Sequence, residues 1–154
     1  MPSKVFEAGI SQKGEMMRLK NIIQPSIGIF TNIGQAHSEN FESLKEKSRE
    51  KVILFKEVKK LVYCKDHREI HDAVIGIHNA QLFDWSSEDN NSFLFVKNIR
   101  QKAGTSTLTL IHNNTEKVFC IPFNDKASTE NCLHVICTLI ALNIPSQKIQ
   151  TGLD

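Results

Sequence analysis

The residues best suited to do chemistry follow two short segments that read as strands. Glu7 is the last residue of segment 4–7 (KVFE), and His37 follows the apolar run 26–31 (SIGIFT). We expect both segments to be buried strands, the second covered on both faces. Ligands of open α/β sheets bind outside the carboxyl ends of the strands, where Glu7 and His37 would meet. A carboxylate and an imidazole there indicate a metal pair, although either residue alone is more often solvated or structural.

A third candidate, Lys51, depends on where the next helix begins. If residues 38–56 were one straight helix, His37 and Lys51 would lie about 21 Å apart and could not share a site. Ser43 and Glu46 form a capping-box pattern, which places the helix start directly after Ser43. The preceding residues can then fold back, so that Lys51 returns to the strand ends. The charge-rich helix face by itself selects no single lysine.

Two further patterns fail on closer reading. Residues 9–14 have the glycine spacing of a phosphate-binding P-loop, but Glu15 and Met16 stand where that motif requires Lys and Ser or Thr. A carboxylate there would repel phosphates, so we reject a P-loop. His67 and His71 lie one helical turn apart, but the glutamate between them is one position out of place for a zinc protease motif. We interpret this pair as a polar helix face.

The remaining pattern predicts alternating strands and helices followed by a β-meander. After the first strand we expect a helix over 15–23, a strand over 26–31, a helix from about 44, a strand over 61–64, a weak helix over 67–77, three β-rich runs over 92–123, and a helix over about 126–143. Helices between the early strands favour parallel pairing, and short turns between the later runs favour antiparallel pairing. The predicted fold class is α/β, with a mostly parallel sheet flanked by helices and a small, separate antiparallel β-meander.

Composition limits the class of protein. The chain has 154 residues with 40% hydrophobic residues, which is enough for one domain with a core. Nineteen Lys and Arg against 17 Asp and Glu give a net charge of +2, which argues against a nucleic-acid partner. No apolar run is long enough for a membrane span, and the first residues lack a signal-peptide core. The four cysteines are expected to be buried, reduced thiols of a cytosolic protein: Cys64, Cys120, Cys132 and Cys137.

Three strings carry a resemblance to a known family. FEAGISQKGEM, IGIFTNIGQAHSENF and KVILF at residues 51–55 together resemble the central ATPase domain of the Mur ligases. The resemblance is dense over the first 55 residues and looser through the meander and the helix after Asp125. Among Mur ligases it is greatest to those that add D-Ala-D-Ala. EAGISQ with DKASTEN also resembles the branch that is fused to an alanine racemase domain.

The resemblance implies roles for the three residues already singled out. Glu7 and His37 correspond to an acidic and a histidine ligand of magnesium, and Lys51 corresponds to a catalytic lysine that is carbamylated by CO₂. Carbamylation turns a cation into an anion, which suits a site that holds two magnesium ions.

The same resemblance implies a nucleotide contact and a larger parent protein. Asn131 corresponds to the adenine-contacting asparagine of the family's H-N-x-x-N-x-L-A-A helix, although Ala127 and Ser128 replace the first two residues of that motif. Residues 1–154 are therefore expected to be a partial, incomplete Mur ligase central (ATP-binding) domain. We expect it to lack the P-loop, the N-terminal UDP-substrate domain and the C-terminal domain.

The activity implied for the parent protein is ATP-dependent amide-bond formation in peptidoglycan precursor synthesis, in the bacterial cytoplasm, with ATP and Mg²⁺. The terminal carboxylate of UDP-MurNAc-tripeptide would become an acyl phosphate, and the amine of D-Ala-D-Ala would displace the phosphate. This chain alone would be inactive. Two alternatives are a non-catalytic truncated fragment and the central domain of a folylpolyglutamate synthase-like ligase, although the string EAGISQ argues against the second.

Overall fold

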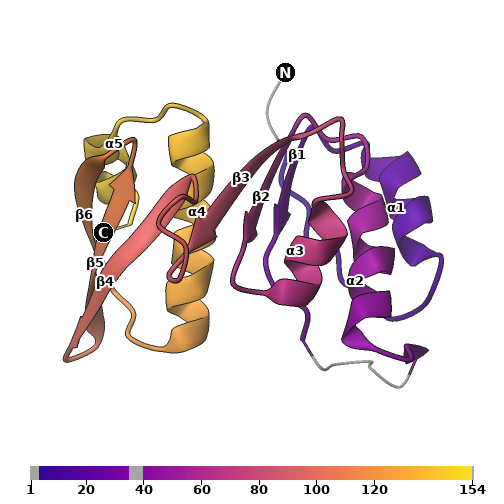
Figure 1. Cartoon of the computed structure of the whole chain (residues 1–154), viewed down its shortest axis with the longest axis horizontal. Helices are drawn as coiled ribbons and strands as arrows, with labels where there is room; N and C mark the ends of the chain where they lie inside the picture. The colour runs from indigo at the N-terminus through magenta and orange to yellow at the C-terminus, as the bar shows by residue number, and fades with distance from the viewer. Residues whose placement is uncertain (1–3, 35–39, 154) are drawn as a thin grey trace.

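The computed structural model describes residues 4–34 and 40–153, which form a six-stranded sheet with helices on both faces (Figure 1). The strands, in sheet order, are β1 (Ile27–Phe30), β2 (Lys60–Cys64), β3 (Gln81–Ser86), β4 (Leu94–Lys102), β5 (Thr105–His112) and β6 (Thr115–Ile121). The helices are α1 (Glu15–Ile23), α2 (Leu44–Val52), the 3₁₀ turn η2 (Ile53–Phe55), α3 (Arg68–Val74), α4 (Lys126–Ala141) and α5 (Ser146–Thr151). The predicted α/β class is confirmed.

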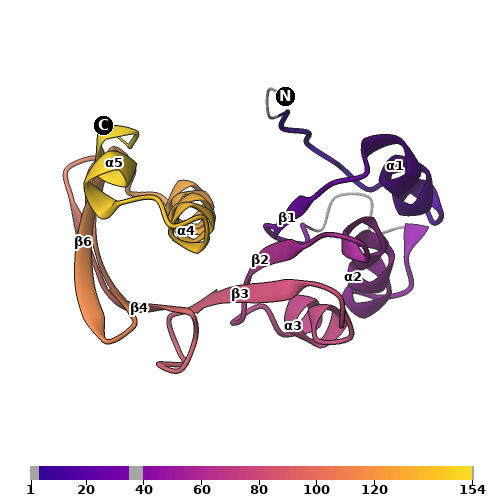
Figure 2. The same cartoon turned by 90° about the horizontal axis from the view of Figure 1, so that it is seen from above.

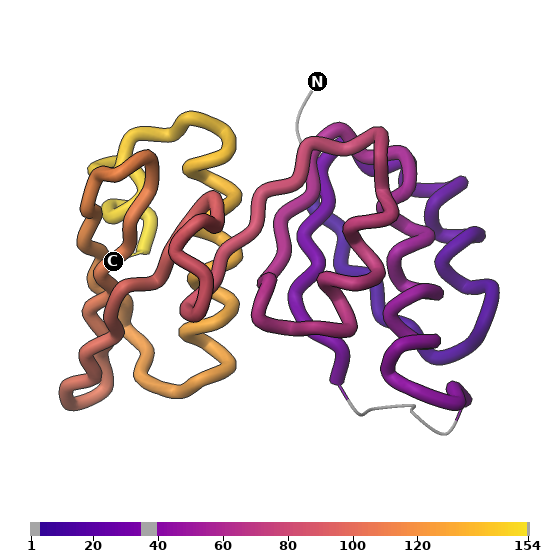
Figure 3. Tube along the Cα trace, in the orientation of Figure 1, coloured from indigo at the N-terminus to yellow at the C-terminus, as the bar shows by residue number. Residues whose placement is uncertain are grey.

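The pairing changes from parallel to antiparallel at β4. Strands β1, β2 and β3 pair in parallel, and β4, β5 and β6 form an antiparallel meander. The link between the two halves is short: only Trp85 and Ser86 of β3 pair with Leu94 and Phe95 of β4, in parallel. Because β4 begins where β3 ends, a short loop can join two parallel strands that would otherwise need a long crossover. Figure 3 traces this single passage between the halves.

The sheet separates two hydrophobic cores. Successive residues of a strand point to opposite faces, so Leu61 and Tyr63 of β2 pack with α1–α3, whereas Val62 and Cys64 face α4. Figure 2 shows the sheet curling so that β4–β6 wrap around α4 and α5. Lys60 also ties the halves together, because its Nζ donates to the Ala141 carbonyl at 2.9 Å.

Two helix starts follow from side-chain caps. The Ser43 hydroxyl accepts a hydrogen bond from the Glu46 N–H at 3.1 Å, so α2 begins directly after Ser43, as predicted. The Asp125 carboxylate accepts from the Ser128 N–H at 2.8 Å and caps α4 in the same way. These caps set where α2 and α4 begin, and therefore which of their residues reach the site.

Two predictions for the early strands are wrong. Residues 4–7 form no strand: the Val5 and Phe6 side chains are 98% and 57% exposed. A strand requires a hydrogen-bonded neighbour, and in the described structure β1 pairs only with β2. Strand β1 is also not covered on both faces, because Gly28 and Phe30 are buried while Ile27 and Ile29 are more than a third exposed. Its outer face lies beyond the reach of α4 (Figure 2).

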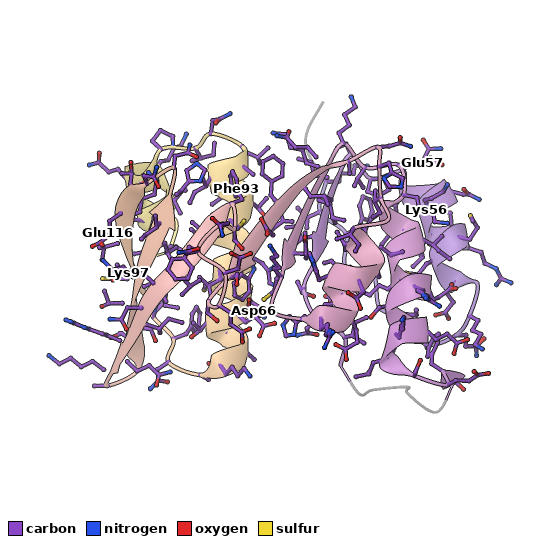
Figure 4. The ribbon with its side chains drawn as sticks, viewed as in Figure 1. Lys56, Glu57, Asp66, Phe93, Lys97 and Glu116 are labelled. Atoms are coloured by element: carbon purple, nitrogen blue, oxygen red, sulfur yellow. The ribbon has the colours of Figure 1, made fainter. Side chains whose placement is uncertain are left out.

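Three further expectations need correction. The meander is not separate, because β4 pairs with β3 and continues the same sheet. Strand β3 was not predicted at all, since its polar Asp84 and Ser86 interrupt the apolar run. Cys120 is exposed on edge strand β6, whereas the other three cysteines are buried, and all four are free thiols. On the meander's solvent side, Lys97 and Glu116 form an ion pair at 2.7 Å (Figure 4).

No helix within the described residues is long and apolar enough to cross a membrane.

Candidate active site

An open cleft of about 770 Å³ lies between α1, α2 and the segment that follows β1. In Figure 1 these elements are the indigo and violet part of the chain, away from the meander. The cleft is lined by Glu7, Gly9, Ile10, Ser11, Glu15, Arg18, Leu19, Asn32, Ile33, Gly34, Lys47 and Lys51. It therefore joins residues that are more than 40 positions apart in the sequence.

One wall is a tight turn that leads into α1. The Glu15 carboxylate accepts hydrogen bonds from the Ser11 N–H at 2.7 Å, the Ser11 hydroxyl at 2.8 Å and the Gln12 N–H at 2.9 Å. The bonds from the Ser11 and Gln12 backbone lower the pKa of Glu15, because they stabilise its charged form. Gly14 has a φ of +86°, which permits the turn. Glu15 thus has a structural role at the start of the helix.

The same turn is attached to α2. The Gly14 N–H donates to the Glu50 carboxylate at 2.7 Å, and Lys13 pairs with Glu46 at 2.6 Å. Exposed ion pairs contribute little to stability by themselves. Together with the charged hydrogen bond at Gly14, however, the Lys13–Glu46 ion pair holds the turn before α1 against α2, which forms the opposite wall of the cleft.

That other wall presents two lysines to backbone carbonyls of the segment after β1. Lys51 Nζ donates to the Asn32 carbonyl at 3.3 Å and lies 5.4 Å from the centre of the Phe30 ring. Lys47 is 3% exposed, and its Nζ donates to the Gly34 carbonyl at 2.8 Å. Helix α2 and the strand-end segment are therefore joined through lysine side chains.

The surroundings of Lys51 favour its neutral amine. Burial lowers the pKa of Lys51, and repulsion from Lys47 lowers it further, whereas attraction to Glu7 acts in the opposite direction. A neutral amine is a nucleophile, whereas an ammonium group is not. Among the cleft's cationic side chains, Lys51 is thus a candidate for covalent modification.

The structure brings two of the four predicted site residues together. Glu7 and Lys51 line the same cleft and interact electrostatically, even though Glu7 does not end a strand. His37 lies outside the described residues. Asn131 is exposed on α4 and is not among the residues that line the cleft. Within residues 4–34 and 40–153, no three His, Cys, Asp or Glu side chains are grouped to hold a metal ion.

Sequence reasoning missed Lys47 and Asn32. Lys47 and Lys51 are four residues apart on α2 and therefore lie on one helix face. That spacing was visible in the sequence, but the four Lys and Arg residues of the segment 45–51 obscured it. Asn32 contributes a backbone carbonyl, which no residue type could have indicated.

The neighbouring strand ends form a polar cluster beside α4. Asp66 follows β2 and accepts hydrogen bonds from the Ser86 hydroxyl, the Ser87 N–H at 2.8 Å and the Ser87 hydroxyl at 2.7 Å (Figure 4). His67 Nε2 lies 2.7 Å from the Glu130 carboxylate of α4. This cluster ties the carboxyl ends of β2 and β3 to each other and to the helix that carries Asn131.

His67 and His71 therefore have separate partners. His71 Nδ1 lies 3.1 Å from the Tyr63 hydroxyl, on the opposite face of the sheet from α4. The two imidazoles do not form a shared metal site with a third ligand among the described residues.

The family is decided by sequence comparison. A sequence profile of the Mur ligase middle domain matches residues 3–139, which is most of the chain. The chain belongs to the Mur ligase family. The predicted family is thereby confirmed, and the cleft lies within the matched part of its middle domain.

Relatives of the Mur ligase chain carry one recurring name. The UDP-N-acetylmuramoyl-tripeptide–D-alanyl-D-alanine ligase of Buchnera aphidicola is 29% identical over 97% of this chain. The chain spans 34% of that relative, about a third of its length.

Solved structures agree on the fold of the Mur ligase chain. MurF from Acinetobacter baumannii matches 94% of this chain with a TM-score of 0.79 and 18% identity, over 32% of its own length. MurF from Thermotoga maritima in complex with ADP matches 88% with a TM-score of 0.73 and 16% identity, also over 32% of its length. An FPGS structure from L. casei has a lower TM-score of 0.66.

Proposed function

We propose that this chain is part of an ATP-dependent amide ligase that joins D-Ala-D-Ala to UDP-MurNAc-tripeptide. The observation that carries the proposal is that three relatives aligned with 97% of the chain all bear the name of that ligase. The chain spans about a third of each, so the proposal concerns a complete ligase of which residues 1–154 are one part. In particular, these residues contain no complete P-loop motif.

The reaction couples two steps. A carboxylate oxygen of the tripeptide attacks the γ-phosphorus of ATP, the bond to ADP breaks, and an acyl phosphate forms. The D-Ala-D-Ala amine then attacks the acyl carbon, loses a proton and displaces inorganic phosphate. In the first step two anions must approach each other, so the main requirement is positive charge at the phosphates.

The cleft supplies part of that charge. Arg18 and Lys47 line it, and the Glu15 carboxylate is already bound by backbone and hydroxyl donors. Bound Mg²⁺ would neutralise the phosphates during transfer. We propose that Glu7 and His37 hold magnesium and that Asn131 contacts the adenine.

Magnesium fits these residues under one condition. Glu7 offers the oxygen ligand that Mg²⁺ prefers, but the Lys51 ammonium would repel the ion. If CO₂ adds to the neutral Lys51 amine, with loss of one proton, the amine becomes a carbamate whose single negative charge is shared by two oxygens. The lowered pKa of Lys51 supports this modification, because it increases the fraction of neutral amine.

The test is to replace Lys51 in the complete ligase. Lys51→Ala should abolish phosphate release that depends on both substrates, while the melting temperature stays close to that of the wild type. Excess bicarbonate should not restore activity, because the amine itself is gone. The matched control is Lys45→Ala, an exposed lysine on the same helix, which should retain activity.

Two results would contradict the proposal. Full ligation by Lys51→Ala would remove the proposed role of the lysine. A complete wild-type protein that hydrolyses ATP with glutamate and a folate, but not with D-Ala-D-Ala, would favour the folylpolyglutamate synthase-like alternative. The present chain alone should show no ligation, as expected of a non-catalytic fragment. Fusion to an alanine racemase and a cytoplasmic location stay predictions from the sequence resemblance.

A further inference from the structure

His134 is a buried histidine that the proposed reaction does not use. It lies on α4, its side chain is 1% exposed, and both ring nitrogens have partners. The Trp85 indole N–H donates to His134 Nδ1 at 3.1 Å, and His134 Nε2 lies 3.1 Å from the Thr31 carbonyl oxygen. Because the carbonyl can only accept and the indole can only donate, the ring is neutral with its proton on Nε2. Burial lowers the pKa of His134 to about 4, in agreement with that form.

The two partners belong to different parts of the sheet. Trp85 is in β3, whereas Thr31 directly follows β1, past the last residue that pairs with β2. The imidazole therefore links β3, in the middle of the sheet, to the first residue of the segment that follows β1.

Thr31 begins the segment that holds the lysines. The next residue, Asn32, accepts a hydrogen bond from Lys51, and Gly34 accepts one from Lys47. Three side chains thus anchor a segment of four residues: His134 from α4, and two lysines from α2. A rotation of the Thr31 carbonyl would move the Asn32 carbonyl, because adjacent peptide planes share one Cα atom.

We propose that His134 is a positioning residue, which fixes segment 31–34 relative to α4. The distance between Lys51 and Asn131, the nucleotide contact proposed on α4, then stays constant. Asn131 lies three residues before His134, on the same side of α4. This inference rests on the proposed function for its catalytic consequence, whereas its structural part concerns this chain alone.

The first experiment uses the wild-type chain and is independent of activity. Long-range ¹H–¹⁵N NMR spectra should show His134 as the neutral tautomer with hydrogen on Nε2. A coupling across the hydrogen bond should connect Nε2 to the Thr31 carbonyl carbon. A ring protonated on Nδ1 would overturn the proposal. Absence of this coupling would also overturn it when the Nε2 proton exchanges slowly with water, because the coupling is then observable.

The second experiment compares two replacements of similar size. His134→Gln keeps one acceptor for Trp85 and one donor for Thr31, whereas His134→Leu keeps neither. Amide shifts of Asn32, Ile33 and Gly34 should change in the leucine variant and return toward wild-type values in the glutamine variant. His71→Leu, which removes a histidine on the other face of the sheet, is the control and should leave these shifts unchanged.

The third experiment measures catalysis in the complete ligase. His134→Leu should lower kcat at least tenfold with KM for ATP within threefold, and His134→Gln should recover most of kcat. Equal activity of the leucine variant and the wild type, or no rescue by glutamine, would overturn the positioning role. If wild-type protein lacks ligation while the NMR results hold, the proposed function fails and the hydrogen-bond anchor stands. If the leucine variant does not fold, the proposal is tested by the activity of the glutamine variant and by the Nε2–Thr31 coupling in the wild type.

Discussion

Lys51 shows how the packing of one side chain determines its chemistry. Lys51 is partly buried, with the Lys47 side chain nearby and the Asn32 carbonyl as acceptor, and its pKa is lowered from that of an exposed lysine. Both burial and like charge favour the neutral amine. The residue type alone would not distinguish Lys51 from the exposed Lys45 on the same helix.

His134 makes stability depend on pH. Burial lowers its pKa to about 4 in the folded chain, from an ordinary value of 6.5. Attraction to Glu130 and the hydrogen bond to the Thr31 carbonyl act in the opposite direction, whereas repulsion from His67 lowers the pKa further. The unfolded chain therefore binds more protons between pH 6.5 and 4, so this stability is complete above pH 6.5 and is lost as the pH falls. We expect the free energy of unfolding to drop by about 2 kcal/mol between pH 7 and pH 5.

Urea unfolding at the two pH values measures this drop. His134→Gln should remove most of it, because the amide does not titrate. Carboxylates with lowered pKa, such as Glu15 and Asp125, act mainly below their ordinary values of 4.5 and 3.8 and therefore do not obscure the comparison. A drop of equal size in the glutamine variant would contradict the assignment to His134.

At the scale of elements, the contact of η2 with β1 depends on the absence of a side chain. A Cβ atom on Gly28 would lie 2.5 Å from Phe55 Cδ1 and 2.9 Å from Leu61 Cδ1. Both neighbours are buried in the core under α1–α3, so neither can move freely. Gly28→Ala should therefore reduce the free energy of unfolding by about 1–3 kcal/mol, measured by chemical denaturation.

A matched glycine tests the steric explanation. A Cβ atom on Gly76 would meet its first atom at 3.8 Å, so Gly76→Ala should change stability by less than about 0.5 kcal/mol. The double variant Gly28→Ala with Phe55→Leu should recover part of the loss. Equal effects of the two alanine variants would show that the close approach at Gly28 is not the cause.

The edge of β6 is closed by a side chain rather than by another strand. The Cys120 N–H donates to Gln150 Oε1 at 2.9 Å, and Gln150 Nε2 donates to the Cys120 carbonyl at 2.9 Å. This amide of α5 thus imitates a strand neighbour and protects an edge that could otherwise pair with another chain. Gln150→Ala should cost about 1–2 kcal/mol of unfolding free energy.

Thermal unfolding and light scattering should be followed together for Gln150→Ala. The control is Gln147→Ala on the exposed side of the same helix, which should behave like the wild type. If the Gln150 variant is as stable as this control and shows no more self-association, the two hydrogen bonds do not stabilise the edge.

At the scale of the whole molecule, the chain presents a cleft without a complete phosphate site. Arg18 and Lys47 supply positive charge, but the glycine-rich loop that would enclose the phosphates is absent from the 154 residues. We expect this chain to bind Mg-ATP with a dissociation constant in the millimolar range or weaker. Calorimetry that finds micromolar binding would contradict this expectation, and the complete ligase is the positive control.

Much of the architecture was determined by local sequence. Apolar runs predicted β1 and β2, the Ser43 and Asp125 caps predicted the starts of α2 and α4, and short polar turns predicted the meander. These features depend on residues close together in the chain, and for that reason sequence patterns indicate them.

Tertiary structure decided everything that depends on distant partners. Residues 4–7 look like a strand but have no paired neighbour, and β3 carries polar residues that are satisfied only by contacts such as Asp84 with the Phe93 N–H. Glu7 was singled out as the end of an expected strand that does not form, and Lys51 was singled out through the family resemblance, but the fold places both in one cleft. The anchoring by Lys47 and His134 was not predicted, because hydrogen bonds to the backbone carbonyls of Gly34 and Thr31 depend on how α2, α4 and β1 pack together.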